Sequence, residues 1–134
     1  IDDIIPSFLD QEISGLTHGD FGPQQFILDN SGRLFLIDWE DVHRGRQIED
    51  IAWFLWTTYK NVQDPLELSA QFQNGYKQKM HWSFTPIRLQ IATDIKIRVL
   101  PQFAEMPHKD IKEAWAKRLE ESLSNKFLDF LKQL

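Results

Sequence analysis

The sequence predicts a mainly helical α+β fold with one small β-hairpin, and three features of the chain predict it. Apolar residues recur at helical spacing over most of the chain after residue 47. Within that region, two Pro-containing segments mark helix starts. Before it, two short apolar runs flank an Asp-Asn-Ser-Gly-Arg segment, which is typical of a hairpin turn. The length of 134 residues suits one domain or one lobe.

Each predicted helix has its own start signal and apolar pattern. Residues 2–14 have helical spacing, with Pro6 in the first turn and Gly15 as the C-cap. Residues 47–60 are apolar on nearly every side, so we expect a buried helix with the hairpin of residues 24–38 against it. Further helices are expected from Pro65 to about Met80, from Pro86 to about Leu100, and as one final helix after Pro107.

The hairpin separates two carboxylates. Its apolar runs, residues 26–28 and 34–37, look too apolar for a surface ribbon, so we expect it to be half buried. Asp20 stands just before the hairpin, and Asp38 stands where its second strand ends. A half-buried hairpin would therefore fix the distance between the two acids.

Phosphoryl transfer requires acids in this arrangement. A loop Asp accepts the proton of the attacking hydroxyl or orients it, while a polar side chain five residues later and a second Asp hold Mg²⁺ on the nucleotide phosphates. Asp20, Gln25 and Asp38 have these offsets. Magnesium takes few protein ligands, mostly oxygen, because substrate phosphates supply the rest. Asp20 is thus the candidate catalytic residue, and Gln25 and Asp38 are the candidate metal ligands.

A set of motifs between residues 16 and 54 resembles the aminoglycoside phosphotransferase and choline kinase-like group. The motifs are, in order, His18-Gly19-Asp20, Pro23, Ile37-Asp38-Trp39-Glu40, Gly45 and Asp50. The resemblance implies that residues 1–134 form the C-terminal catalytic lobe of a protein kinase-like phosphotransferase, with the N-terminal nucleotide lobe absent from this chain. It also implies that Asp50 is a structural residue at the start of the next helix.

Three positions within these motifs leave alternatives open. The family pattern has Asn where this chain has Gln25, whose amide oxygen lies one methylene further from the backbone. His18 and Glu40 are candidates for the nucleotide–metal site. The alternatives are that the His18 ring packs under the loop and bonds backbone carbonyls, and that Glu40 is a solvated acid. Asp50 near a helix start would favour the helix dipole and could bond N–H groups of the catalytic loop.

Composition excludes several other functions. The net charge of −5 argues against binding to nucleic acid, which requires basic patches. The chain has no cysteine for disulfides or thiolate zinc sites, and no apolar run has membrane-spanning length. We therefore expect a cytoplasmic protein without a membrane partner. A metal-dependent phosphoesterase is a weaker hypothesis, because the other histidines do not have the sequence spacing of metal ligands.

The resemblance implies a small-molecule kinase that uses Mg²⁺ with ATP or GTP and phosphorylates a hydroxyl acceptor. Its partner would be its own N-terminal lobe, and residues 1–134 alone would be inactive, because the nucleotide sits between the two lobes. An exposed apolar face should remain where that lobe docks, and this face is also a candidate for self-association. The alternative is a catalytically weak or inactive kinase-like protein that binds a nucleotide or small molecule, in which Gln25 marks a lost metal ligand.

The acceptor is not named by the sequence. Acidic residues between 60 and 134 would suit a cationic amine acceptor if they lined a pocket, whereas solvated helix faces explain them more simply; they are Glu67, Asp94, Glu105, Asp110, Glu113, Glu120 and Glu121.

Overall fold

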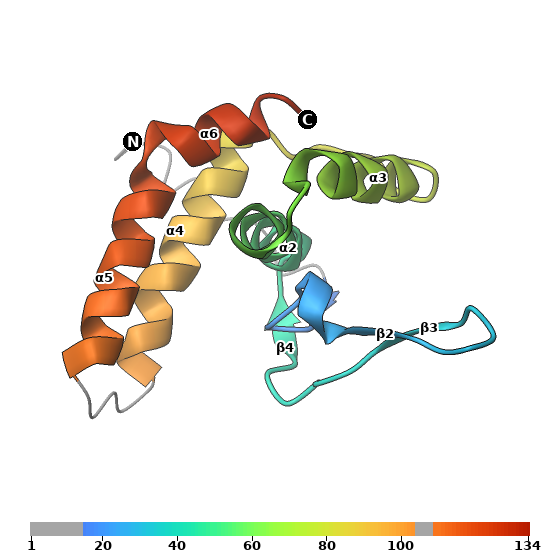
Figure 1. Cartoon of the computed structure of the whole chain (residues 1–134), viewed down its shortest axis with the longest axis horizontal. Coiled ribbons are helices and arrows are strands. Elements are labelled where there is room, and N and C mark those ends of the chain that lie inside the picture. The colour runs from blue at the N-terminus through green and yellow to red at the C-terminus, as the bar shows by residue number, and fades with distance from the viewer. Residues whose placement is uncertain (1–14, 104–108) are drawn as a thin grey trace. The chain divides into compact units, whose positions relative to one another are not determined.

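The computed structural model describes residues 15–103 and 109–134, and the chain divides into two compact units after Pro65 (Figure 1). The predicted helix 2–14 lies outside the described residues. The first unit contains β1 (Gly15–Thr17), the 3₁₀ turn η1 (Pro23–Gln25), β2 (Phe26–Leu28), β3 (Leu34–Leu36), β4 (His43–Gly45) and α2 (Gln47–Asn61). The other helices are α3 (Pro65–Lys77), α4 (Pro86–Phe103), α5 (Lys109–Leu123) and α6 (Asn125–Leu131). These elements confirm the mainly helical α+β fold.

Helix α2 is buried along most of its length, as its apolar sequence predicts. Trp53 is 7% exposed and Phe54 is 4% exposed, and seven further residues between Ile48 and Thr58 are also buried. The helix begins without a side-chain N-cap, but the backbone N–H of Arg46 donates to the Glu49 carboxylate over 3.3 Å. Two acids in the first turn complement the positive end of the helix dipole.

The hairpin forms as predicted, from antiparallel β2 and β3 with Phe26 opposite Leu36. Its turn is organised by Asp29, which accepts hydrogen bonds from the backbone and side chains of Ser31 and Arg33. The hydrogen bond from the Ser31 side chain is the largest of several effects that lower the pKa of Asp29 to about 2. The turn chemistry of this Asp-Asn-Ser-Gly-Arg segment therefore closes the hairpin locally.

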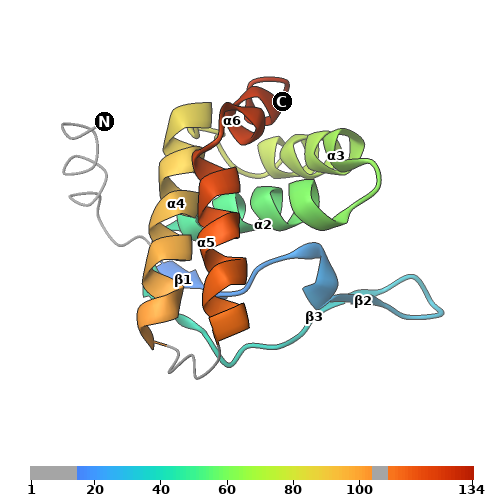
Figure 2. The ribbon, with the colours of Figure 1, turned by 60° about the vertical axis from the view of Figure 1, so that its left-hand side comes forward.

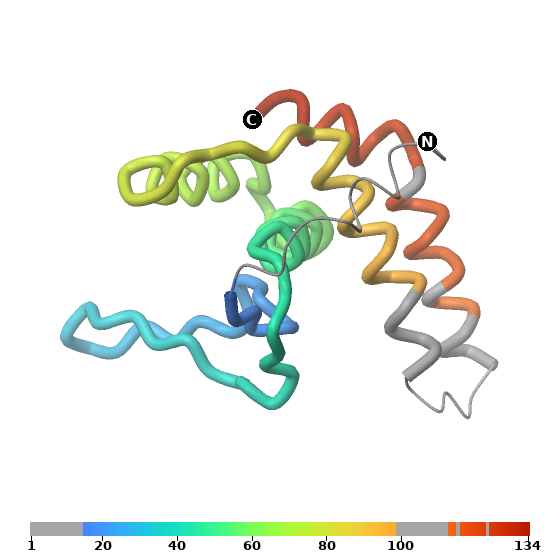
Figure 3. The backbone as a smooth tube through the Cα atoms, turned by 180° about the vertical axis from the view of Figure 1, so that it is seen from behind, coloured from blue at the N-terminus to red at the C-terminus, as the bar shows by residue number. Residues whose placement is uncertain are grey.

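The expectation that the hairpin is half buried is wrong for its outer part. The side chains at Ile27, Leu28, Leu34 and Phe35 are between 46% and 67% exposed. Only the base is packed, where the Phe26 ring meets Phe21 and Phe54. Beyond that first pair the ribbon extends away from α2 (Figure 3), so within the described residues of this unit its apolar side chains have little to pack against.

A second pair of short strands holds the segment before the loop of residues 18–20. Strand β1 pairs antiparallel with β4, with Thr17 opposite His43. The sequence alone did not predict this pairing of β1 with β4. This pairing brings the chain back to the loop just before α2 begins.

The second unit is a set of packed helices. Helices α4 and α5 run side by side with α6 across their ends (Figure 2). Gln90, near the start of α4, donates through its side-chain amide to the Ser122 carbonyl near the end of α5, so the two helices are antiparallel. The Phe127 and Phe130 rings of α6 are buried and stack with their centroids 6.0 Å apart.

The final helical segment is two helices, not one continuous helix as predicted. The chain leaves helical geometry at Ser124, whose φ of −69° and ψ of 148° are extended, and α6 begins at the next residue. Serine favours such N-cap positions over helix interiors. Phe127, Phe130 and Leu131 of α6 are buried. Among the described residues, no helix is both long and apolar enough to cross a membrane.

Candidate active site

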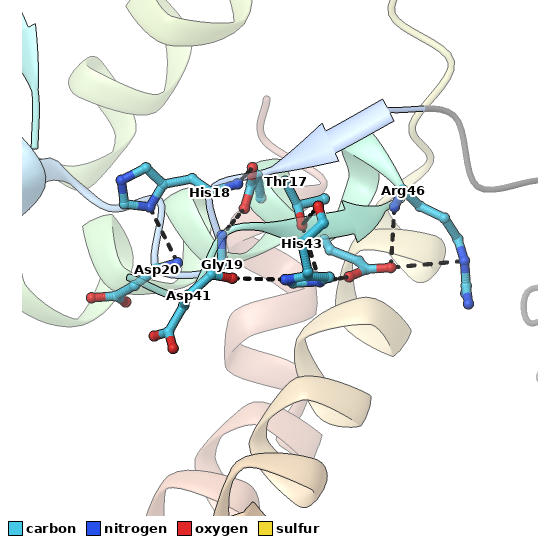
Figure 4. Close-up of polar contacts among 9 residues, drawn as sticks. Thr17, His18, Gly19, Asp20, Asp41, His43 and Arg46 are labelled. Carbon is cyan, nitrogen blue, oxygen red and sulfur yellow. Dashed lines mark hydrogen bonds and ion pairs between the residues drawn. The ribbon is translucent and has the colours of Figure 1, made fainter. Parts of the chain in front are cut away.

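The loop from His18 to Asp20 is held to the first turn of α2 by Asp50. One carboxylate oxygen of Asp50 accepts the backbone N–H of His18 at 2.7 Å, and the other accepts that of Gly19 at 3.1 Å. His18, Gly19 and Asp20 are labelled in Figure 4. Each contact is a hydrogen bond to an ionised acceptor, which is stronger than a neutral one. This confirms the prediction that Asp50 bonds the catalytic loop.

Glycine is required at Gly19. Its φ is +89°, in the left-handed region that residues with a Cβ rarely adopt. A Cβ at this position would also collide with the backbone and side chain of Asp41. The loop can therefore turn tightly enough for Asp50 to reach two successive N–H groups.

The ring of His18 ties the same loop to the end of the hairpin. Its Nε2 lies 2.7 Å from the Ile37 carbonyl, which can only accept, so Nε2 carries the proton. Its Nδ1 then accepts the Asp20 backbone N–H at 3.3 Å. These contacts, with the ring only 2% exposed, match the alternative in which His18 packs under the loop. A direct role of His18 at the nucleotide remains a prediction.

The carboxylate of Asp20 is held at both oxygens. The Gln25 side chain donates through Nε2 to Oδ2 at 2.5 Å, and the indole Nε1 of Trp53 donates to Oδ1 at 2.6 Å. Asp20 keeps partial solvent exposure, whereas Gln25 and Trp53 are both buried. A carboxylate oxygen can accept a second hydrogen bond, so both contacts leave Asp20 able to accept one from a hydroxyl.

Asp38 is the one non-glycine residue with positive φ in the described part of the chain, at +66°. Such a conformation is uncommon outside glycine, although Asp and Asn tolerate it best. The flanking residues fix it: the Ile37 N–H donates to the Gln25 carbonyl at 2.9 Å, and the Trp39 ring lies 4.7 Å from the His18 ring. Asp38 itself is solvent-exposed. The residues before and after it both contact the segment that carries Asp20 and Gln25.

The donor set near this loop suits magnesium. The Asp38 carboxylate is exposed, and the Gln25 amide nitrogen is bound to Asp20, which leaves the amide oxygen as the atom for a cation. Both are hard oxygen ligands of the kind that Mg²⁺ takes together with substrate phosphates. In the described residues, no group of three or more His, Cys, Asp or Glu side chains is arranged to hold a metal ion. Glu40 is exposed, and its place at the site remains a prediction.

A second polar cluster joins β1, β4 and α2 through His43 (Figure 4). Its Nδ1 donates to the Asp41 carbonyl at 2.8 Å, and its Nε2 lies 3.0 Å from the Thr17 hydroxyl and 3.3 Å from the Glu49 carboxylate. The Thr17 hydroxyl donates its proton to the His43 carbonyl at 3.1 Å, so towards Nε2 it can act only as an acceptor. Both ring nitrogens of His43 therefore face hydrogen-bond acceptors. The Asp41 carbonyl, and then Glu49, raise the pKa of His43, while partial burial opposes them.

This cluster predicts a pH dependence of stability. The folded pKa of His43 lies above its unfolded value of about 6.5, so the protonated ring stabilises the folded state. This stabilisation is fully present below the unfolded pKa and is lost as the pH rises through the folded pKa. We expect the thermal unfolding midpoint to fall as the pH rises between these two values, and we expect His43→Gln to remove part of that fall. Calorimetry at a series of pH values checks it, with His81→Gln at an exposed position as the control. An unchanged pH dependence in His43→Gln would contradict the assignment.

The sequence missed the contact between Trp53 and Asp20. Trp53 and Trp56 are both buried, as the apolar sequence of residues 47–60 predicts. A signal existed in the spacing, because Trp53 lies three residues after Asp50 and so shares its helix face. The indole N–H of a buried Trp usually finds an acceptor.

Most acidic side chains of the second unit that the structure describes are exposed. Glu67, Glu113 and Glu120 are exposed, which is the simpler alternative for them. Asp94 is partly buried, and burial raises the pKa of its carboxyl. Glu105 and the side chain of Asp110 lie outside the described residues.

The comparisons with known proteins bear on the segment that carries this site. The model of a family described as the phosphotransferase enzyme family matches residues 2–85 of the 134. Neither the curated proteins nor the solved structures gave a match. The matched segment includes β1 to β4, α2 and α3, and ends just before α4.

Proposed function

Because this chain belongs to the phosphotransferase enzyme family, we propose that it is the catalytic lobe of a small-molecule kinase. In this proposal the γ-phosphate of ATP or GTP moves to a hydroxyl group of a small acceptor, with Mg²⁺ as the cofactor. The observation that carries the proposal is the Asp20 carboxylate, which is partly exposed, held at both oxygens and located in the matched segment.

Asp20 supplies the acid–base part of the reaction. Its carboxylate accepts the hydrogen bond of the acceptor hydroxyl and takes the proton as the oxygen attacks the γ-phosphorus. The bond between the γ-phosphorus and the bridging oxygen breaks, and the nucleoside diphosphate leaves with that oxygen. Since both Asp20 oxygens already accept an N–H, the carboxylate is oriented before the acceptor arrives.

Asp38 and Gln25 are the residues that would hold the metal. Bound there, Mg²⁺ supplies charge neutralisation at the nucleotide phosphates. The exposed carboxylate of Asp38 matches that charge, and the left-handed backbone at Asp38 fixes its direction. Gln25 links Asp20 to the segment that carries Asp38, since its side-chain amide donates to Asp20 and its backbone carbonyl accepts the Ile37 N–H.

The exposed hairpin supports an N-terminal lobe as the partner of this chain. Kinase-like enzymes bind the nucleotide between two lobes. The apolar side chains of Ile27, Phe35, Ile37 and Trp39 are each between 39% and 50% exposed, next to the candidate metal ligand Asp38. A lobe that covers these side chains would also enclose the nucleotide, so activity is to be measured on the protein that carries both lobes.

Label transfer tests the proposed activity directly. The two-lobe protein is incubated with ATP or GTP labelled at the γ-phosphate and a panel of hydroxyl compounds that includes aminoglycosides and choline. We expect transfer of label to an acceptor in the presence of Mg²⁺ and none with a chelator. Nucleotide binding without any transfer, to a panel member or to water, would favour the catalytically weak binding protein instead.

Replacing Gln25 with asparagine separates these two functions. The shorter amide keeps both hydrogen-bonding atoms and restores the residue usual in the family pattern at this position. If Gln25 is a strained but working ligand, Gln25→Asn is expected to match or raise turnover, because octahedral Mg²⁺ tolerates a displaced ligand poorly. Gain of Mg²⁺ binding without turnover would instead assign the chain to the binding class. Gln24→Asn, at the exposed neighbouring position, is the control.

A further inference from the structure

The indole of Trp53 makes a hydrogen bond that packing alone does not require. Its Nε1 lies 2.6 Å from Oδ1 of Asp20, and the side chain is 7% exposed. Gln25 occupies the other oxygen of the same carboxylate at 2.5 Å. The two donors come from different elements, η1 and α2, so together they fix both the position and the rotation of the Asp20 carboxyl plane.

One face of α2 contacts successive parts of the catalytic loop. Asp50 bonds the backbone of His18 and Gly19, and Trp53, three residues later, bonds the side chain of Asp20. Phe54 continues the face, with its ring 5.6 Å from the Phe21 ring. Successive residues of α2 therefore contact the backbone of His18 and Gly19, the carboxylate of Asp20 and the ring of Phe21.

We propose that Trp53 is a positioning residue for the Asp20 carboxylate, an inference that rests on the function proposed above. A general base must be held within a fraction of an ångström of its productive position. A hydrogen bond from a buried donor to an ionised acceptor is among the stronger ones available for this. With Trp53 at Oδ1 and Gln25 at Oδ2, the remaining lone pairs of Asp20 have defined directions for the acceptor hydroxyl.

A purely structural role makes a different prediction. Asp20 would then serve only to satisfy a buried indole N–H, and removal of the N–H would change stability without changing turnover. Trp53→Phe keeps an aromatic ring in the same place and removes the donor. Trp56→Phe is the matched control, because Trp56 is in the same helix and is 2% exposed.

The contact itself is tested by the indole N–H resonances of the two-lobe protein. The Trp53 resonance is identified by its disappearance in Trp53→Phe. Asp20→Asn is expected to move this resonance upfield, because a neutral acceptor replaces a carboxylate, and to leave the Trp56 resonance in place. A Trp53 resonance that does not respond to Asp20→Asn would overturn the inference, whether or not the protein is active.

The positioning role is tested by Mg²⁺-dependent release of phosphate from ATP, with water as the acceptor. We expect Trp53→Phe to lower kcat about 10-fold, the effect of one hydrogen bond to a charged group, and to leave KM for ATP unchanged. Trp56→Phe should leave both constants unchanged. If Asp20→Asn lowers kcat and Trp53→Phe does not, the inference fails and the proposed function stands. If Asp20→Asn itself has no effect, the proposed function fails.

Discussion

Replacing Asp38 with asparagine is expected to abolish Mg²⁺-dependent phosphoryl transfer by the two-lobe protein. The substitution removes the charge that would compensate the metal and the nucleotide phosphates. It does little to the backbone, because Asn tolerates the φ of +66° at this position about as well as Asp. Loss of activity in this variant therefore reports on the carboxylate and not on the turn that carries it.

The measurement is transfer of labelled γ-phosphate over a range of Mg²⁺ concentrations. Asp41→Asn is the matched control, because Asp41 is an exposed acid three residues further along the same segment. We expect wild-type activity in Asp41→Asn and none in Asp38→Asn at any Mg²⁺ concentration. Full activity of Asp38→Asn would exclude Asp38 as the principal metal ligand.

Replacing Asp20 with asparagine is expected to lower turnover by about 10²–10⁴-fold, the usual range for loss of a general base. The side chain keeps its size, and its oxygen can still accept from Trp53 or Gln25, but not from both, since the other terminal atom becomes an N–H₂ donor. The variant therefore loses the proton acceptor and one of its two anchors.

Steady-state kinetics with ATP as the varied substrate checks this result. Because Asp20 acts on the acceptor, we expect kcat to fall while the affinity for the nucleotide is largely retained. A parallel loss of nucleotide affinity would place Asp20 at the metal instead. Unchanged turnover would mean that the chain resembles the phosphotransferases in fold but not in the role of Asp20.

The sequence was sufficient where the pattern is local. The apolar run after Gln47 predicts the buried helix, and the Asp-Asn-Ser-Gly-Arg segment predicts the hairpin, because each depends on neighbours along the chain. The hydrogen bonds from the loop to Asp50 were also foreseen, since an acid in the first turn of a helix is available to nearby N–H groups.

The sequence was insufficient where distant segments decide the outcome. The apolar runs 26–28 and 34–37 were expected to be half buried, but the pattern does not say what would cover them. Helical spacing places Trp53 on the face of α2 that carries Asp50, but the acceptor that its indole N–H meets depends on where the Asp20 side chain lies. The left-handed backbone at Asp38 is likewise fixed by contacts of Ile37 and Trp39 with other segments.

The proposed roles of Asp38 and Asp20 are tested most directly by the affinity of the two-lobe protein for ATP, measured by calorimetry with Mg²⁺ and with a chelator. In the proposed site, Asp38 binds the metal and Asp20 binds the acceptor. We therefore expect Mg²⁺ to strengthen ATP binding in the wild type and in Asp20→Asn, and we expect this effect to be lost in Asp38→Asn. Equal strengthening by Mg²⁺ in Asp38→Asn, or its loss in Asp20→Asn, would contradict the assignment.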